Sequence, residues 1–277
     1  MQGSGNWSPP TGTLGQILSE ASGRITELRR DAARLERAAA DAVRSDISLM
    51  SALCQEMVGV IAEVKRRSPS KGWIAQGLST VDQAHAYADG GAAAISVLTE
   101  PVHFDGSIED LDSVVGDLDL PILKKDFHVD PIQLAEARAH GATAALLIVR
   151  ALDPRRLELM IDAAVQLRLE TLVEVRDEIE LQRALDAGAT MIGINNRDLE
   201  TLVIDPTTSE RLLPMIPDRI VSVAESGIAS VADVQRAAAL GANGVLVGSS
   251  LSSAQDPEAM VRQLGSVPQV PRARRVR

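Results

Sequence analysis

The sequence predicts an α/β protein, a (β/α)8 TIM barrel with an N-terminal helical extension. Short apolar runs alternate with amphipathic helical stretches, which is typical of repeated βα units. None of the runs alternates cleanly between polar and apolar residues, as expected for parallel strands buried on both faces. The length of 277 residues is close to the size of one such barrel. The expected strands comprise residues 58–64, 93–98, 121–126, 144–149, 170–175, 190–195, 219–224 and 243–248.

The chain before the first strand has a different composition. Residues 1–12 are rich in Gly, Ser and Pro, and we expect them to be disordered. Residues 13–57 form the predicted helical extension, with one helix over 13–44, whose apolar residues recur at helical spacing, and a second short helix over 47–57. The barrel is expected over 58–265, followed by a flexible basic tail, 266–277.

A Gly-Ala pair precedes four of the expected strands. The glycines are Gly91, Gly141, Gly188 and Gly241, and each follows a helical stretch. Glycine can adopt the left-handed conformation that ends a helix, so the pairs predict helix ends followed by strands. An open eight-stranded sheet is the alternative, but the G-x-G-x-x-G fingerprint of a dinucleotide-binding sheet is absent after the first run.

Composition limits the partners of the protein. The net charge of −10 argues against a nucleic-acid partner, because phosphate backbones require a basic face. No apolar run is long enough to span a membrane and no signal peptide is evident, so we expect a cytoplasmic protein. The single cysteine, Cys54, is expected to be a buried apolar residue. The four histidines lack metal-ligand spacing, and we expect no metal and no cofactor.

The chemistry of such a barrel lies at the carboxyl ends of its strands. Polar residues gather at these ends although a buried strand has no structural need for them, and burying an unpaired charge is costly. The candidates are Glu63, Lys65, Thr99, Glu100, Lys125, Arg150, Glu174, Asn195, Ser226 and Gly248.

Lysine usage narrows the choice. Only four of the 28 basic residues are lysines, and all four lie at the end of the first or third expected strand or just after it. Lys71 and Lys124 fit solvated loop positions, whereas Lys65 and Lys125 are expected to face the site. Unlike arginine, a lysine ammonium can donate a proton, and it shifts its pKa readily on burial. Glu63 lies two residues before Lys65, so the two share one face of the strand.

Aromatic residues and glycines suggest two binding subsites. Trp73, Phe104 and Phe127 are three of only five aromatic residues, and all lie in loops at the expected mouth. They favour a pocket for a flat apolar or aromatic group. The seventh and eighth strands end in Ser226-Gly227 and Gly248-Ser249. The corresponding loops of such barrels commonly bind phosphate.

Taken together, these motifs resemble the indole-3-glycerol phosphate synthase family from about residue 58 to 251. The departures lie in the N-terminal 57 residues. The resemblance rests on nine segments in the same order, IAEVKRRSPSKG (61–72), ISVLTE (95–100), FDGS (104–107), PILKKDF (121–127), LLIV (146–149), LVEV (172–175), IGINNRDL (192–199), AESGI (224–228) and VGSSL (247–251).

The resemblance implies a specific reaction. The substrate would be 1-(2-carboxyphenylamino)-1-deoxyribulose 5-phosphate, which closes to indole-3-glycerol phosphate with loss of carbon dioxide and then water. It implies Lys125 as general acid with Glu174 as its acid–base partner, and Lys65 beside Glu63 as a holder of the substrate carboxylate. Asn195 and Ser226 would orient the intermediates. The implied binding residues are Ser68, Phe104, Phe127, Leu146, Arg197, Leu199 and Glu225 for substrate, and Gly227, Gly248 and Ser249 for phosphate.

Within this family pattern, Arg197 would pair with a carboxylate, and Glu225 would contact the lysines from outside the substrate pocket.

Three alternative functions are open. Phosphoribosylanthranilate isomerase, a related barrel, would place a Cys at the end of strand one and an Asp at the end of strand six. This chain has Glu63 and Lys65 at the first of these ends and Asn195 at the second. The others are a Schiff-base aldolase and a non-catalytic sugar-phosphate-binding barrel. We expect a small phosphorylated substrate as the partner and a monomer or weak homodimer.

Overall fold

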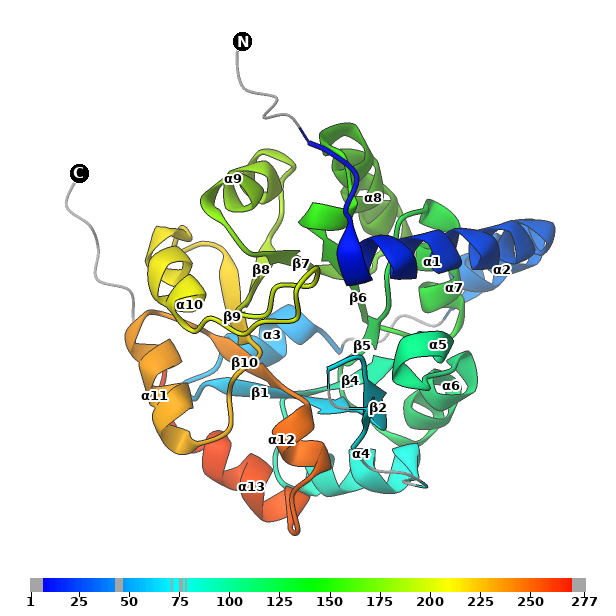
Figure 1. The fold of residues 1–277 in the computed structure, drawn as a ribbon. Coiled ribbons are helices and arrows are strands. Elements are labelled where there is room, and N and C mark those ends of the chain that lie inside the picture. Colours follow the sequence, from blue (N-terminus) through cyan, green and yellow to red (C-terminus); the bar gives the residue numbers. More distant parts are fainter. Residues whose placement is uncertain (1–6, 43–46, 71, 75–76, 78, 271–277) are drawn as a thin grey trace.

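The computed structural model describes residues 7–42, 47–70, 72–74, 77 and 79–270. Within them, eight parallel strands close into a barrel in the order β1-β10-β9-β8-β7-β6-β5-β4 (Figure 1). This confirms the closed barrel over the open sheet. The barrel strands are β1 (Gly59–Val64), β4 (Ala94–Leu98), β5 (Ile122–Lys125), β6 (Ala144–Ile148), β7 (Glu170–Val175), β8 (Met191–Asn195), β9 (Val221–Glu225) and β10 (Gly244–Val247).

The remaining elements surround the barrel or extend from its loops. A two-stranded hairpin, β2 (Arg67–Ser68) with β3 (Gly72–Trp73), follows β1. The helices after the strands are α4 (Thr80–Asp89), α5 (Pro101–Phe104), α6 (Ile108–Asp117), α7 (Pro131–Ala139), α8 (Pro154–Leu167), α9 (Glu178–Asp186), α10 (Thr207–Leu212), α11 (Val231–Ala239), α12 (Ser249–Ser252) and α13 (Pro257–Leu264), with 3-10 turns η1 (Val149–Ala151) and η2 (Leu213–Met215).

Side-chain alternation on the strands separates two cores. On β1, Val60, Ala62 and Val64 belong to the large core between strands and helices, whereas Ile61 belongs to the core inside the barrel. Glu63 shares the parity of Ile61 and therefore points inward. This alternation places the charged residues at the strand ends inside the mouth of the barrel.

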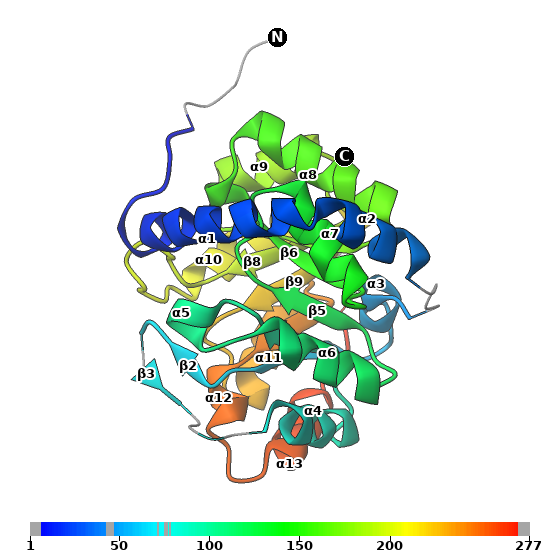
Figure 2. The same ribbon diagram turned by 90° about the vertical axis from the view of Figure 1, so that its right-hand side faces the viewer.

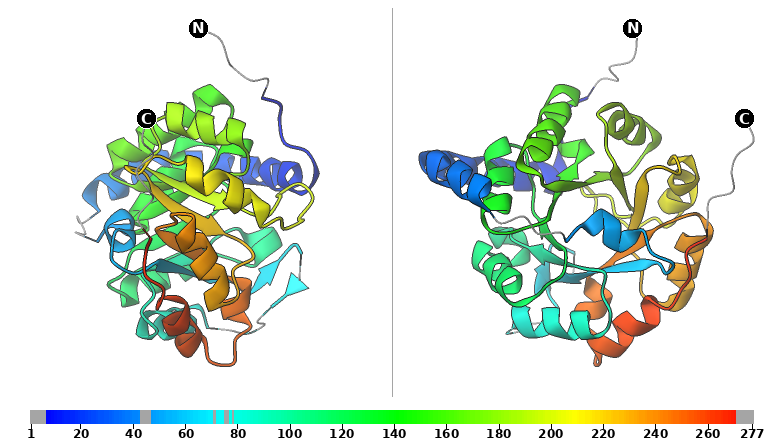
Figure 3. Two further views of the ribbon diagram at one scale, coloured as in Figure 1. Left: turned by 90° about the vertical axis from the view of Figure 1, so that its left-hand side faces the viewer. Right: turned by 180° about the vertical axis from the view of Figure 1, so that it is seen from behind.

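The helical extension covers both ends of the barrel. The single helix expected over 13–44 is instead two helices, α1 (Gly12–Arg30) and α2 (Ala32–Asp41), separated at Asp31. Helix α1 crosses the mouth side, and α2 packs against α7 (Figure 2). Helix α3 (Leu49–Leu53) covers the opposite end, as seen from behind in Figure 3. Leu53 fills that end closely, since a Cβ on Gly59 or Gly244 would lie 2.5 or 2.8 Å from its side chain.

The segments at the two ends of the chain also make contacts. Trp7 donates its indole N–H to the Arg150 carbonyl at 3.2 Å, within the stretch expected to be disordered. Gln269 donates its amide to the carbonyls of Leu53 and Met57, within the stretch expected to be a flexible tail. Lys71 and residues 271–277 lie outside the described residues.

The prediction that Cys54 is buried is wrong, because this residue follows α3 on an exposed turn.

Helix boundaries follow from local chemistry. Eight of the described helices begin after a Ser or Asp whose side chain accepts a backbone N–H of the first turn, which stabilises the start of a helix. These caps are Ser48, Ser79, Ser107, Asp130, Asp153, Asp177, Ser230 and Asp256. All four predicted glycines after helices have positive φ angles, between 79° and 91°, as expected from the Gly-Ala pairs. Among the described helices, none is long and apolar enough to cross a membrane.

Two of these glycines allow a matched test of backbone strain and packing. A Cβ on Gly188 would meet nothing within 4 Å, whereas one on Gly141 would lie 2.5 Å from the Val115 side chain. We predict that Gly188→Ala lowers the free energy of unfolding by about 1–2 kcal/mol, the cost of a left-handed residue. Gly141→Ala should cost about 1–3 kcal/mol more because of overpacking. Urea denaturation of both variants measures the difference, and equal losses would contradict the packing argument.

Candidate active site

A cavity at the carboxyl ends of the strands collects most of the predicted site. Twelve of the predicted residues line it, namely Lys65, Ser68, Phe104, Lys125, Phe127, Leu146, Glu174, Asn195, Arg197, Leu199, Ser226 and Ser249. Glu63, Glu225, Gly227 and Gly248 do not line the cavity. The first two are buried within the barrel beneath the mouth. The structure therefore brings residues from all eight barrel strands and their loops to one place.

A cluster of lysines and glutamates forms the floor of this cavity. Lys65 contacts Glu63 directly. Lys125 Nζ lies 3.8 Å from Glu63 Oε2 and 4.0 Å from Glu174 Oε2. The lysine side chains are about 15% exposed, while those of Glu63 and Glu174 are almost fully buried. Lys125 is thus held between two carboxylates and has its ammonium group at the cavity.

The charges in this cluster stabilise one another. Burial alone would raise the pKa of Glu63, but Lys65 and Lys125 outweigh that effect and hold it below its usual value. Burial alone would lower the pKa of Lys125, but the nearby carboxylates, chiefly Glu63 and Glu174, outweigh it and raise the pKa above its usual value. Lys125 therefore carries its proton at neutral pH, as a general acid must.

Glu225 adds a third carboxyl group to two ammonium groups. Its carboxyl oxygens are buried, and no cation among the described residues donates a hydrogen bond to them. Burial and the neighbouring Glu174 raise the pKa of Glu225 well above its usual value. Burial and Glu174 therefore both favour the neutral form of Glu225 over the ionised form. Glu225 occupies the space beside Gly193, where a Cβ would lie 2.0 Å from Glu225 Oε1.

The expected phosphate-binding loops have special backbone geometry. Ser226 and Gly227 are both left-handed, with φ angles of 63° and 83°. A serine in that region is uncommon, and such strain is often found at functional sites. Gly248 approaches the charged cluster closely, because a Cβ there would lie 2.4 Å from Glu63 Oε1. Ser249 follows it as the first residue of α12.

The other wall of the cavity is apolar. The rings of Phe104 and Phe127 are 6.2 Å apart, and Lys65 Nζ lies 5.9 Å from the centre of the Phe104 ring. Helix α1 contributes Thr13, Leu14 and Ile17 to the same cavity. These three residues were not predicted. Their helical spacing in the sequence indicates an apolar face but not the surface that it meets.

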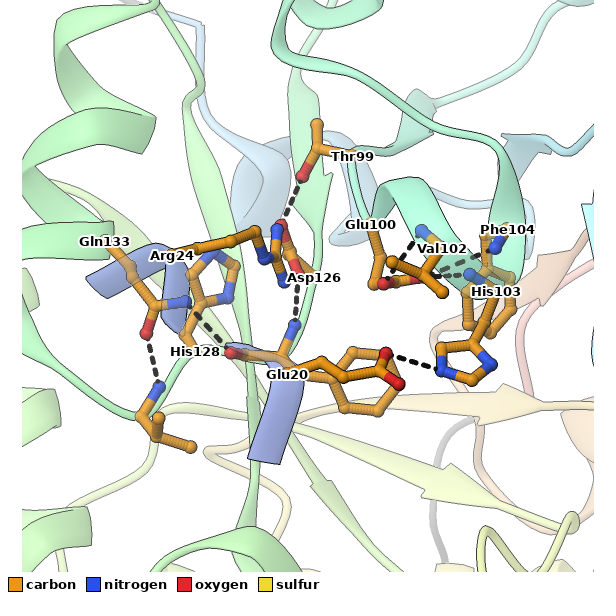
Figure 4. Close-up of polar contacts among 12 residues, drawn as sticks. Glu20, Arg24, Thr99, Glu100, Val102, His103, Phe104, Asp126, His128 and Gln133 are labelled. Atoms are coloured by element: carbon orange, nitrogen blue, oxygen red, sulfur yellow. Dashed lines mark hydrogen bonds and ion pairs between the residues drawn. The ribbon is translucent and has the colours of Figure 1, made fainter. Parts of the chain in front are cut away.

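Several strand-end candidates have structural roles instead. Glu100 accepts the backbone N–H groups of Val102, His103 and Phe104 and so caps α5 (Figure 4). Thr99 donates its hydroxyl to Asp126. Arg150 pairs with Glu200 at 2.7 Å.

Three further expectations need correction. Lys124 is not in a solvated loop; it is fully buried outside the barrel and pairs with Glu136 at 2.6 Å. No described carboxylate forms an ion pair with Arg197, which donates to the Leu202 carbonyl at 3.0 Å. Trp73 lies outside the cavity wall, where it is half exposed beneath the Arg67 guanidinium.

Fold and site together define a (β/α)8-barrel enzyme whose cavity joins a lysine–glutamate cluster to an apolar wall. The model of the indole-3-glycerol phosphate synthase family matches residues 14–264, which include most of α1 and all of α2. Two relatives of that name come from Mycobacterium leprae (strain TN), with 47% identity over 86% of this chain and 89% of the relative, and Mycolicibacterium smegmatis, with 46% over 85% and 88%. The chain belongs to the indole-3-glycerol phosphate synthase family and is a carboxy-lyase of tryptophan biosynthesis.

Solved structures support the fold at much lower identity. A 3-hexulose-6-phosphate synthase from Salmonella typhimurium superposes with a TM-score of 0.61 and 16% identity, over 75% of this chain and 97% of that one. A thiamine phosphate pyrophosphorylase from Pyrococcus furiosus gives 0.56 and 17%, over 75% and 93%. At such identities the likeness concerns the barrel alone.

The raised pKa of Glu225 favours its neutral form and predicts a difference between two isosteric substitutions. Glu225→Gln should keep turnover within about tenfold, whereas Glu174→Gln should lose about 10²-fold or more, the usual contribution of an acid–base group. An unfolded glutamate ionises at about pH 4.3, so Glu225 destabilises the native state at higher pH, where it must take up a proton on folding. Glu225→Gln should therefore raise the unfolding free energy at pH 7 and have little effect at about pH 4. Lower stability of this variant at pH 7 would contradict a neutral Glu225.

Proposed function

We propose that this cavity converts 1-(2-carboxyphenylamino)-1-deoxyribulose 5-phosphate to indole-3-glycerol phosphate with Lys125 as the general acid. One observation carries the assignment. Lys125 is a charged lysine at the cavity, held between Glu63 and Glu174 and followed two residues later by Phe127 in the apolar wall. A proton donor and a surface for an aromatic ring are thus adjacent, as the ring closure requires.

The steps follow from these positions. The ring carbon that bears the carboxylate attacks the ketone carbon, and Lys125 protonates the ketone oxygen. Carbon dioxide then leaves with its bonding electrons returned to the ring system. Lys65, charged against Glu63, holds the substrate carboxylate until that point. Lys65 then gives the second proton, and the new hydroxyl leaves as water. Glu174 accepts the final proton from the carbon beside the ring nitrogen. That proton and one proton from solvent restore the two lysines.

The rest of the cavity would hold the two ends of the substrate. Phe104, Phe127, Leu146 and Leu199 suit the aromatic ring, because all four are apolar and line the same cavity. The phosphate fits the loops with Ser226-Gly227 and Gly248-Ser249, with Ser68 nearby in the lining. Asn195 is buried in the lining, and it and Ser226 would orient the substrate hydroxyl groups.

We also propose the setting in which the enzyme acts. The net charge of −10 supports a small phosphorylated substrate and no nucleic-acid partner. A cytoplasmic monomer or weak homodimer suits a chain with these properties. The contacts of Trp7 and Gln269 support an ordered unit that extends beyond the barrel limits of 58 and 265.

The assignment predicts that Lys125→Ala lowers turnover by about 10²-fold or more while the barrel remains folded. The measurement is the indole fluorescence that appears when purified protein meets the carboxyphenylamino substrate. Arg262→Ala is the control, since Arg262 is an exposed cation on α13. Turnover of Lys125→Ala within a few-fold of the wild type, with an unchanged circular dichroism spectrum, would exclude Lys125 as the acid.

The indole fluorescence assay and a borohydride trapping experiment separate the alternative functions. A non-catalytic sugar-phosphate-binding barrel would give no fluorescence at saturating substrate. A Schiff-base aldolase would form a covalent adduct at Lys125 when borohydride is added with a ketose phosphate, and we expect none.

A further inference from the structure

Helix α1 is joined to the active-site end of β5 by a bidentate ion pair. Arg24 Nη1 and Nη2 lie 2.9 and 2.8 Å from the two carboxylate oxygens of Asp126 (Figure 4). Asp126 lies between Lys125 and Phe127 in the sequence. The pair therefore connects a helix of the extension to the backbone that carries the general acid and part of the ring pocket.

Asp126 is a fixed point in this part of the barrel. Its carboxylate is buried and also accepts the Thr99 hydroxyl at 2.8 Å and the Phe127 backbone N–H at 2.7 Å. Burial alone would raise its pKa, but Lys124 and Arg24 outweigh that effect and hold the pKa well below its usual range. The carboxylate thus stays ionised, and removal of Arg24 would leave a buried charge with only Lys124, 3.9 Å away, as a cationic partner among the described residues.

The same helix makes a second contact of this kind. Glu20 lies 2.9 Å from His103, which directly precedes Phe104 (Figure 4). Ile17, Glu20 and Arg24 recur at spacings of three and four, so they lie along one face of α1. That face contributes Ile17 to the cavity and contacts the residues next to both pocket phenylalanines.

We infer that Arg24 is a positioning residue for the reaction, which acts through Asp126 to hold Lys125 and Phe127 in their working places and to seat α1 as a wall of the ring pocket. This inference rests on the proposed roles of Lys125 and Phe127. Arg24 does not line the cavity and need not touch substrate. Its bidentate geometry requires a guanidinium, which lysine reproduces only in charge.

The chain provides a matched control on the same helix. Arg29 pairs with Asp130 at 2.7 Å, but its side chain is 64% exposed against 30% for Arg24. Asp130 caps α7 rather than adjoining the cavity. Both substitutions to Gln remove one ion pair between α1 and the loop after β5. Only Arg24→Gln should disturb the catalytic strand end.

The test compares kcat, KM and urea unfolding for Arg24→Gln, Arg24→Lys, Arg24→Ala and Arg29→Gln. We expect Arg24→Gln to lower kcat by about tenfold to 10²-fold, the effect of a small misplacement of a reacting group, and to raise KM. Arg24→Lys should recover part of the loss, and guanidinium ion below denaturing concentration should restore part of the Arg24→Ala activity. Arg29→Gln should keep kcat within twofold.

Two results would overturn the inference. One is a kcat for Arg24→Gln within twofold of Arg29→Gln. The other is a loss that follows only the fraction of unfolded protein and is not restored by guanidinium. Lys125→Ala, assayed in parallel, separates the two proposals. If it stays active, the site assignment fails; if it is inactive while Arg24→Gln is normal, only the role of Arg24 fails.

Discussion

The site depends on the placement of Lys125 between Glu63 and Glu174 at the end of the barrel. A lysine buried alone would lose its proton, because burial favours the neutral form. The surrounding carboxylates reverse that preference and keep Lys125 charged. The third carboxyl group, Glu225, accepts no hydrogen bond from a cation among the described residues, and burial beside Glu174 raises its pKa and favours its neutral form. The cluster thus places a charged ammonium group beside a buried carboxyl group that favours its proton.

The barrel supplies the room that this cluster requires. Two glycines of the barrel wall, Gly193 on β8 and Gly248 after β10, lie where a Cβ would meet the carboxyl groups of Glu225 and Glu63. A protein interior packed to normal density has no other space for these groups. The absence of side chains at these two positions is therefore as much a part of the site as the charged residues.

Strand alternation explains how much could be predicted from the sequence. Glu63 and Lys65 share a face, and so the barrel and its charged mouth follow from the pattern of apolar runs. The environment of Lys124 could not be read in this way. Alternation places it outside the barrel, but its burial depends on Glu136 in α7, a partner set by the packing of that helix. Cys54 is exposed for the same reason, since nothing local shows that α3 ends in a turn at the surface.

The contacts of the helical extension could not be predicted from the sequence either. They show that α1 forms part of the active-site cavity. The periodic apolar residues of α1 predicted a helix, yet Leu14 and Ile17 pack with Phe127 and Leu146, which lie far along the chain. No local rule connects segments so distant, because their contact is made only when the barrel closes. The match to the family begins at residue 14, within α1, so the helix belongs to the unit that the family model describes rather than to a variable leader. The ion pair of Arg24 with the buried Asp126 then joins a wall of the pocket to the strand carrying Lys125. On our inference, this pair couples the folding of the extension to the chemistry of the barrel.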